Sequence, residues 1–357
     1  MMPRTMKAVV LKGHGGFEQL EYRDDLPVPM PAAGEVLLRV GAAGVNNTDI
    51  NTRIGWYSKA VAADTAAAAR QAPPDSAASG WAGTAFVFPR VQGADACGRI
   101  VAVGAGVAAS RIGERVLVDP VLRPPGGELA GVQYLGADRD GAFAEYLVVP
   151  ASNAHRIETA LSDAELASFP CAYSAAENML ERAGVTAGET VLVTGASGGV
   201  GAAAVQLAGQ RGARVIAQTT RDKAADVRAL GAQQVVERGA DLLAQLGRET
   251  VDVVVDVVGG AAFPTLLEVL RRGGRYAVAG AIAGPIATLD LRTLYLKDLR
   301  LLGCTVTPAG VFVRLVQLIE NGQLRATVRV TYPLSEIAAA QSDFLDKAQA
   351  GKIVLLP

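Results

Sequence analysis

Three polar side chains in one short stretch, Asn46, Asp49 and Tyr57, have the types and spacing that best suit catalysis. The Asn46 amide and the Tyr57 phenol can each donate a hydrogen bond to a substrate oxygen on which negative charge develops, and the Asp49 carboxylate can orient either donor. Arg53 and Lys59 are further candidates. The alternative is structural, because Asn46 and Asp49 are also suited to cap the helix expected over residues 48–54.

A second group of residues has the chemistry of a phosphate site. The apolar run 191–193 leads into a glycine-rich turn and then into the alanine-rich stretch 202–210. Glycines let a pyrophosphate approach the backbone, and the helix N-terminus offers free N–H groups. With another strand expected over 213–218, the pattern A-x-G-x-x-G predicts a dinucleotide-binding β-α-β unit, and the alternative is a tight turn in a parallel sheet. The expected contacts are Ala196, Ser197, Gly198, Gly199, Val200 and Gly201.

The end of that second strand indicates which nicotinamide cofactor is bound. NAD-dependent enzymes place an acidic residue there to hold the ribose 2′-hydroxyl. This chain instead has Thr219 and Thr220, followed by Arg221 and Lys223, which offer donors and positive charge to a 2′-phosphate. We therefore expect NADPH. The alternative is that Arg221 and Lys223 only begin a solvated helix, with Asp222 partly cancelling their field.

Length and composition favour two domains, because 357 residues exceed what one core usually supports and half of them are hydrophobic. The formal net charge of −1 gives no electrostatic reason to expect a nucleic acid or an anionic membrane surface as partner. The N-terminal residues lack a long apolar segment, and no uninterrupted apolar run is long enough to span a bilayer. We expect a soluble, cytoplasmic protein.

Cysteine and histidine are scarce. Cys97, Cys171 and Cys304 lie far apart and form no C-x-x-C pair, so neither a disulfide framework nor a structural zinc cluster is expected. His14 and His155 belong to no recognisable triad or metal cluster.

The elements that position these residues fall into two patterns. The first 150 residues hold β-type runs separated by prolines and glycines, as in an irregular β-barrel. Strands and helices alternate from about residue 161 to residue 289, as in a doubly wound parallel sheet. The tail contains an apolar helix over 311–320, a strand around 328–330 and a final strand over 352–356.

This order resembles the medium-chain dehydrogenase/reductase superfamily over nearly the whole chain, and most closely its zinc-free quinone oxidoreductase branch. The phrases that carry the resemblance lie at residues 43–49, 113–116, 141–146, 188–201, 256–260 and 351–355. The resemblance implies an α/β fold with a GroES-like irregular β-barrel catalytic domain, over 1–155 and 294–357. A Rossmann doubly wound domain that binds NADP(H), over 156–293, is inserted between the two barrel segments.

The resemblance also places the active cleft between the two domains. Val257, Gly280 and Ala281 are then expected near the nicotinamide, at the carboxyl ends of two strands. A homodimer is expected by family analogy, with residues 275–278 and 299–304 as possible edge elements.

The zinc alcohol dehydrogenases of this superfamily hold a catalytic metal with a Cys, a His and a second Cys. The corresponding positions here are Asn46, Ala94 and Cys171, and the stretch 120–140 contains no cysteine. One thiol and an amide do not make a three-ligand zinc site, so we expect no metal.

Without a metal, the site suits hydride transfer from NADPH to a small apolar quinone or α,β-unsaturated carbonyl, whose conjugation already activates it. Two alternatives remain. One is a carbonyl reductase or alcohol dehydrogenase-like enzyme with Tyr57 as the acid. The other is a non-catalytic NADPH-binding structural or regulatory protein.

The connection between Tyr57 and Gln92 is longer than quinone oxidoreductases usually have. Residues 59–70 predict a short helix, and Pro73, Pro74, Trp81, Phe86 and Phe88 follow. Because residues 58–90 come directly after the candidate catalytic residues, we expect a lid or a pocket wall. The alternative is a disordered alanine-rich loop.

Overall fold

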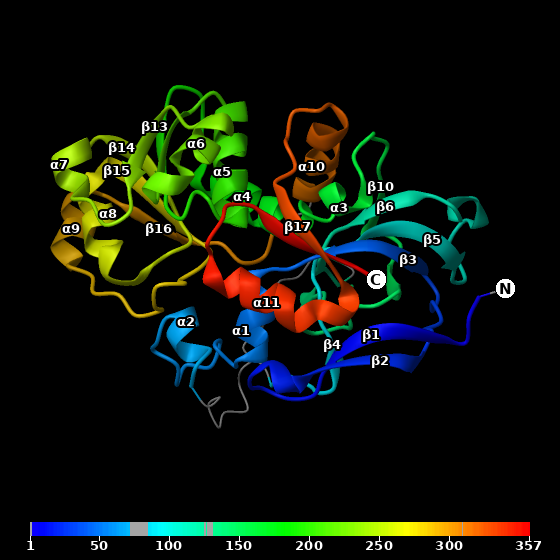
Figure 1. Cartoon of the computed structure of the whole chain (residues 1–357). Coiled ribbons are helices and arrows are strands. Elements are labelled where there is room, and N and C mark those ends of the chain that lie inside the picture. Colours follow the sequence, from blue (N-terminus) through cyan, green and yellow to red (C-terminus); the bar gives the residue numbers. More distant parts are fainter. Residues whose placement is uncertain (1, 72–84, 125, 127–130, 309) are drawn as a thin grey trace.

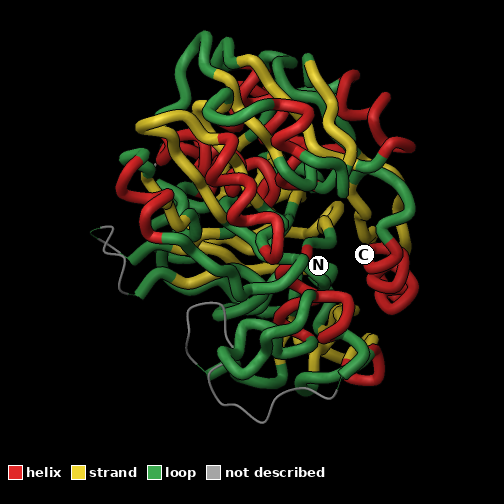
Figure 2. Tube along the Cα trace, turned by 90° about the vertical axis from the view of Figure 1, so that its left-hand side faces the viewer, coloured by secondary structure: helices red, strands yellow, loops and turns green. Residues whose placement is uncertain are grey.

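The computed structural model describes residues 2–71, 85–124, 126, 131–308 and 310–357. It confirms the α/β fold with an irregular β-barrel domain and a doubly wound nucleotide domain, which lie side by side with both chain ends on the barrel (Figure 1). Loops, green in Figure 2, make up much of the lower part of the molecule, where the first strands and the first two helices lie.

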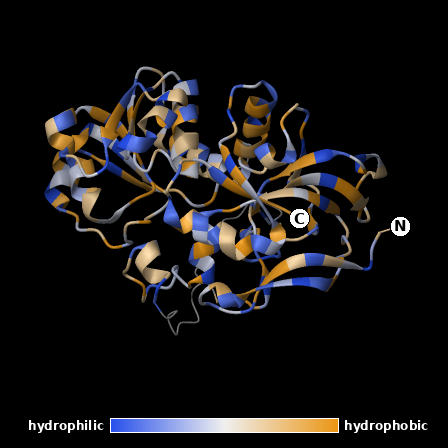
Figure 3. Cartoon of the chain, in the orientation of Figure 1, coloured by the Kyte–Doolittle hydropathy of each residue, from blue (hydrophilic) through white to orange (hydrophobic). Residues whose placement is uncertain are grey.

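The barrel domain is built from two main sheets, in which every strand pair is antiparallel except the parallel pair β17–β18. One has the strand order β2-β1-β4, and the other has the order β10-β6-β5-β3-β18-β17, with β9 also paired to β3. Figure 3 shows that the inner strand β1 is mainly hydrophobic, whereas β2 is mainly hydrophilic. The strands of this domain are β1 (Thr5–Leu11), β2 (Leu20–Pro27), β3 (Glu35–Gly44), β4 (Arg90–Val91), β5 (Cys97–Val103), β6 (Arg115–Val118), β7 (Val121–Leu122), β8 (Gln133–Tyr134), β9 (Tyr146–Pro150), β10 (Ala154–Arg156), β17 (Val328–Pro333) and β18 (Lys352–Leu356).

The nucleotide domain has a parallel sheet of order β13-β12-β11-β14-β15-β16. Its central strands are fully buried on both faces, which explains their continuous valine-rich sequences. These strands are β11 (Thr190–Val193), β12 (Arg214–Thr219), β13 (Gln234–Glu237), β14 (Val251–Asp256), β15 (Leu270–Val278) and β16 (Arg300–Gly303).

Helices cover this sheet, and others lie on the barrel side (Figure 1). Those around the sheet are α4 (Pro170–Ala183), α5 (Gly199–Gln210), α6 (Ala224–Ala229), α7 (Leu242–Leu246), α8 (Phe263–Val269), α9 (Leu291–Leu296) and α10 (Val311–Glu320). Those on the barrel side are α1 (Asn47–Arg53), α2 (Thr65–Ala68), α3 (Asp163–Leu166) and α11 (Ile337–Asp346).

The tail returns to the barrel, but later than the sequence suggested. The expected boundary at residue 294 falls inside α9, and β16 then pairs in parallel with β15, so the nucleotide sheet extends to Gly303. The last strand, β18, pairs antiparallel with β3, opposite Ala43 and Gly44. Strand β18 thereby brings Lys352 beside the start of α1.

The two domains share packed apolar residues. One buried cluster joins Cys97 and Leu117 of the barrel to Val191 and Val193 of β11 through α4. Because interiors of this density deform little, this contact fixes the barrel side chains relative to the cofactor turn. No helix in the described part of the chain is long and apolar enough to cross a membrane.

Candidate active site

The glycine-rich turn connects β11 to α5 with the geometry that a pyrophosphate site needs. Gly195 has a φ of +56°, and Gly198 lies directly before the first turn of α5. A Cβ atom on Gly201 would lie 2.2 Å from the Gly195 carbonyl oxygen, so only glycine lets α5 pack this closely on the turn. The turn therefore fits a dinucleotide, with the N–H groups of Gly199, Val200 and Gly201 at the helix N-terminus.

Basic side chains gather at the end of β12. Thr219 is buried and donates a hydrogen bond from its Oγ1 to the Ser197 Oγ, 3.0 Å away. Arg221 is exposed and lies 3.9 Å from the Glu237 carboxylate, whereas the Lys223 ammonium donates to the Lys347 carbonyl oxygen.

Two further cations, Arg238 and Lys347, belong to this group. Burial lowers the pKa of Lys347, and the positive charges of Arg238 and Lys223 lower it further, against the opposite effect of Asp64. Positive charges gathered in this way favour a bound anion.

Asp256 organises the carboxyl ends of β14 and β15. Its buried carboxylate accepts hydrogen bonds from the Thr194 hydroxyl at 2.5 Å, the Val258 N–H at 2.8 Å and the Tyr276 hydroxyl. This network shapes the turn that carries Val257, whose carbonyl oxygen lies 3.0 Å from an ideal Cβ on Gly280. Val257, Gly280 and the neighbouring Ala281 thus lie together at this edge of the sheet.

Asn46 and Asp49 both stand at the start of α1. The Asp49 carboxylate accepts a hydrogen bond from the Asn46 N–H at 2.8 Å, as in the capping alternative. Burial raises the pKa of the Asp49 carboxyl to about 7, against the lowering effect of that N–H group. Asp49 is therefore a capping residue of the helix that carries the site.

A buried ion pair fixes the Asn46 amide. Lys352 donates from its Nζ to the Asn46 Oδ1 at 2.6 Å and to the Asp95 Oδ2 at 2.9 Å, while the Asn46 Nδ2 donates to the same Asp95 oxygen at 2.8 Å. The Lys352 side chain also reaches the cofactor turn, because its Cδ lies 3.2 Å from an ideal Cβ on Gly199. The network therefore links the start of α1 to the N-terminus of α5.

Three weak acids meet beside this network. The Tyr134 hydroxyl donates to the Cys171 Sγ at 3.1 Å, and the Tyr57 hydroxyl donates to the Thr48 Oγ1 at 3.2 Å. Burial raises the pKa of Tyr57, and the nearby Cys171 raises it further. Burial also raises the pKa of the Cys171 thiol to about 12, so all three groups stay protonated at neutral pH.

This donor set does not fit a catalytic zinc ion. Ala94 offers no ligand, the Asn46 amide is already bonded to Lys352 and Asp95, and Cys171 is the one thiol at the site. Among the residues that the structure describes, no group of three or more His, Cys, Asp or Glu side chains could hold a metal ion.

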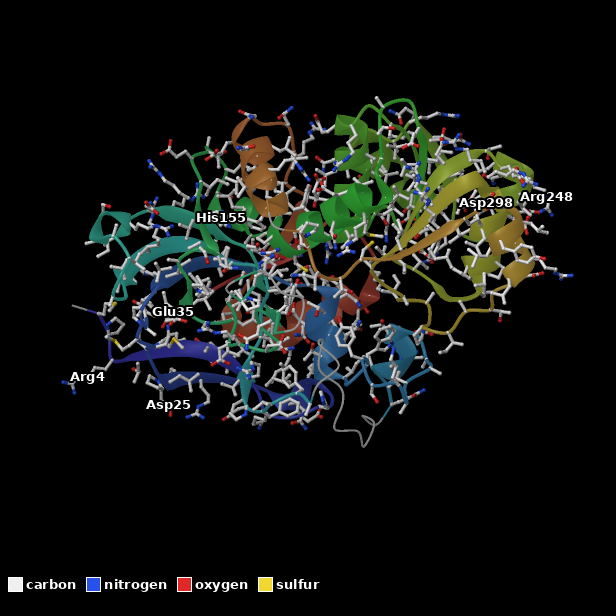
Figure 4. The ribbon with its side chains drawn as sticks, turned by 180° about the vertical axis from the view of Figure 1, so that it is seen from behind. Arg4, Asp25, Glu35, His155, Arg248 and Asp298 are labelled. Atoms are coloured by element: carbon white, nitrogen blue, oxygen red, sulfur yellow. The ribbon has the colours of Figure 1, made fainter. Side chains whose placement is uncertain are left out.

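Other candidates from the sequence lie elsewhere. Arg53 is buried, donates to the Gln341 Oε1 at 2.8 Å and to the Gly15 carbonyl oxygen at 2.7 Å, and lies over the Phe17 ring. Lys59 is exposed. The rings of His155 and Phe312 are tilted relative to each other, with centroids 5.0 Å apart. Figure 4 labels His155 in the view from behind.

The insertion after Tyr57 touches both domains. The expected helix over 59–70 is reduced to α2, whose first residue, Thr65, donates from its N–H to the Ile282 carbonyl oxygen at 3.2 Å, just after Ala281. Phe86 packs against the cluster that contains Ala94 and Tyr134. Residues 72–84, with Pro73, Pro74 and Trp81, lie outside the described residues.

Sequence reasoning missed Asp95, Tyr134, Lys352, Arg238 and Lys347 as site residues. Two weak signals existed: an acidic residue at position 95 in an otherwise small and apolar run, and a lysine at position 352 directly before the buried strand 353–355. Tyr134 had no such signal, because a tyrosine in an irregular loop is common.

Comparisons with known proteins agree with this architecture. Residues 32–159 match the family model described as alcohol dehydrogenase GroES-like domain, and residues 199–321 match the model described as zinc-binding dehydrogenase. The chain is 32% identical to acryloyl-coenzyme A reductase of Metallosphaera sedula, over 98% of this chain and 99% of the relative. It is 28% identical to quinone oxidoreductase of Lama guanicoe, over 99% and 98% of the two chains.

A solved structure is more similar still. A protein provisionally described as an alcohol dehydrogenase, from Sinorhizobium meliloti 1021, shares 49% identity with a TM-score of 0.90, over 100% of this chain and 98% of that one. The fold and the site define a nicotinamide-dependent oxidoreductase. The chain belongs to the medium-chain dehydrogenase/reductase superfamily.

Proposed function

We propose that this protein is an NADPH-dependent, zinc-independent reductase that transfers hydride to an α,β-unsaturated carbonyl compound or a quinone. The observation that carries the proposal is the site beside the cofactor turn, where the protonated Tyr134 phenol donates to Cys171 and the protonated Tyr57 phenol lies nearby, in place of a metal ligand set. A conjugated substrate needs only such donors, because conjugation already delivers the electrons of the incoming hydride to its oxygen. The similarity to acryloyl-coenzyme A reductase and quinone oxidoreductase supports this substrate class.

The preference for NADPH rests on the basic group at the end of β12. Thr219, Thr220, Arg221 and Lys223 stand where an NAD-dependent enzyme carries an acid, and Arg238 and Lys347 add positive charge. A 2′-phosphate would relieve the repulsion among these cations, whereas a 2′-hydroxyl would not.

NADPH, when bound, supplies the hydride from its nicotinamide ring. The residues from Ala196 to Gly201 hold the pyrophosphate, and Val257, Gly280 and Ala281 form the wall beside the nicotinamide. The Lys352–Asp95 pair holds the Asn46 amide and the start of α1 in place. The Tyr57 phenol lies in the turn after α1 and is held by the Thr48 hydroxyl. Residues 58–71 and Phe86 shield the site from water.

Carbonyl reduction is the second candidate. The similarity to the alcohol dehydrogenase structure favours it, and so does Tyr57, whose protonated phenol could act as the acid. Product analysis separates the two, because one reaction saturates the C=C bond and the other yields an alcohol.

We also propose a homodimer formed through the edge strand β16. The neighbouring helix α9 exposes Leu291, Tyr295 and Leu296, and β16 itself exposes Leu301. An apolar patch beside an open strand edge is suited to pair with a second copy. Sedimentation should show a dimer for the natural protein and a monomer for the double variant Leu291→Glu, Tyr295→Glu.

The test of the function is the oxidation of NADPH and of NADH by purified, chelator-treated protein, followed by absorbance with quinones, enones and aldehydes. We expect turnover with NADPH and an enone or quinone. A requirement for added zinc, or turnover with NADH alone, would contradict the proposal. Tight NADPH binding without turnover would favour the non-catalytic alternative.

The cofactor assignment has its own control. Lys223→Ala and Lys347→Ala should each raise the Kd of NADPH by about tenfold, the effect of losing one charge-assisted contact, and leave the Kd of NADH unchanged. Arg248→Ala is the matched control, because Arg248 lies at the outer end of the nucleotide domain (Figure 4). Equal losses for both cofactors would contradict a 2′-phosphate site.

A further inference from the structure

Tyr134 was not selected from the sequence, yet its phenol lies in the site around Cys171. Tyr134 lies on the short strand β8, which pairs with β7 so that Tyr134 faces Val121. Its N–H donates to the Asp138 carboxylate at 2.8 Å, and its carbonyl oxygen accepts from the Ala137 and Asp138 N–H groups. The backbone that carries this phenol is therefore held at several points.

The Tyr134 side chain is buried. It packs in one cluster with Ala94, at the position where the zinc enzymes of this superfamily carry a histidine, and with Cys171, at the position of their second cysteine. The hydroxyl reaches the Cys171 Sγ at 3.1 Å, and the Cys171 N–H is itself fixed by the Asp95 Oδ1 at 2.6 Å. The Tyr134 phenol thus packs with Ala94 and bonds to Cys171.

We propose that the Tyr134 phenol is a catalytic residue, which donates the hydrogen bond that holds the carbonyl oxygen of the substrate during hydride transfer. The assignment rests on the proposed function. The Tyr57 phenol stands close enough to raise the pKa of Tyr134 electrostatically, so the substrate oxygen meets a donor from the turn after α1 and a donor from β8.

The state of the phenol suits this role. Burial raises the pKa of Tyr134 well above its usual value, and the neighbouring Cys171 and Asp95 raise it further. The phenol therefore keeps its proton at neutral pH and stabilises negative charge as a donor.

The reaction consumes NADPH and one proton from solvent. The β-carbon of an enone accepts the hydride that NADPH supplies, and the electrons of the C=C bond move to form an enolate whose oxygen the Tyr134 phenol holds. A proton from water then bonds to the α-carbon, so that one C=C bond is reduced for each NADPH oxidised.

The test compares Tyr134→Phe with the natural enzyme on two substrates, a weakly activated enone and a strongly oxidising quinone. Loss of one preorganised donor should lower kcat for the enone by about 10²-fold with KM unchanged. The kcat for the quinone should fall far less, because this strongly oxidising substrate depends less on a hydrogen-bond donor. The Kd of NADPH and the thermal midpoint should stay at the natural values, which shows that the variant is folded. Tyr146→Phe, on β9 of the barrel, is the matched control and should keep full activity.

Two results would overturn the assignment of Tyr134 while leaving the proposed function intact. One is a Tyr134→Phe enzyme with the natural kcat on the enone. The other is an equal loss on both substrates, which indicates a structural role. A natural enzyme that oxidises NADPH with neither substrate would overturn the proposed function and the assignment together.

Discussion

The cofactor turn and the cluster around Cys171 lie close together but are built on different principles. The turn is formed by the backbone: Gly195 and Gly201 set its conformation, and the first N–H groups of α5 lie at the helix N-terminus, where an anion is favoured. The cluster is formed by side chains from distant segments of the chain, among them Tyr134, Cys171 and Lys352. The turn depends on glycines, which leave room for close packing of the backbone. The cluster depends on each buried polar group having a partner.

Breaking the buried ion pair should have the largest effect on stability. Lys352→Met leaves the Asp95 carboxylate buried without its cation, and the removal of one partner of a buried pair costs about 3–5 kcal/mol. Chemical denaturation measures the change in the free energy of unfolding. The double variant Asp95→Asn, Lys352→Met should recover part of the loss, because it leaves no charge unpaired, and a double variant as unstable as the single one would contradict this.

A methyl group in the turn tests the other region. Gly201→Ala places its Cβ against the Gly195 carbonyl oxygen, and overpacking of this kind costs about 1–3 kcal/mol while it displaces the phosphate-binding N–H groups. We expect weaker binding of NADPH and NADH alike in a titration. Gly209→Ala, on the same helix with open space around it, should instead be neutral or stabilise by up to about 1 kcal/mol.

The smallest predicted effect concerns the pH dependence of the Asp49 cap. Burial raises the pKa of this carboxyl to about 7 in the folded protein, so its contribution to stability is fully present below the unfolded pKa and is lost as the pH rises through 7. Asp49→Asn has no such titration. Between pH 5 and pH 8 the variant should gain about 1–2 kcal/mol of unfolding free energy relative to the natural protein, and a constant difference would contradict the raised pKa.

The two regions also differ in how far the sequence predicts them. The turn and its β-α-β unit were predictable because strand, glycines and helix follow one another, and the sequence also indicated the barrel and the tail helix 311–320. Lys352 and Tyr134 could not be assigned, because only the tertiary pairing of β18 with β3 and of β8 with β7 brings them to α1 and α4. Arg53 was a reasonable candidate from spacing, yet its side chain bonds to Gly15 and Gln341 instead.

The most direct test of the proposed chemistry follows the hydride itself. Metal-depleted protein is incubated with NADPH deuterated at the transferable position and an α,β-unsaturated ketone, and NMR locates the deuterium in the product. We predict deuterium on the β-carbon of a saturated ketone. Deuterium on the carbonyl carbon of an allylic alcohol, or transfer only after zinc is added, would contradict it.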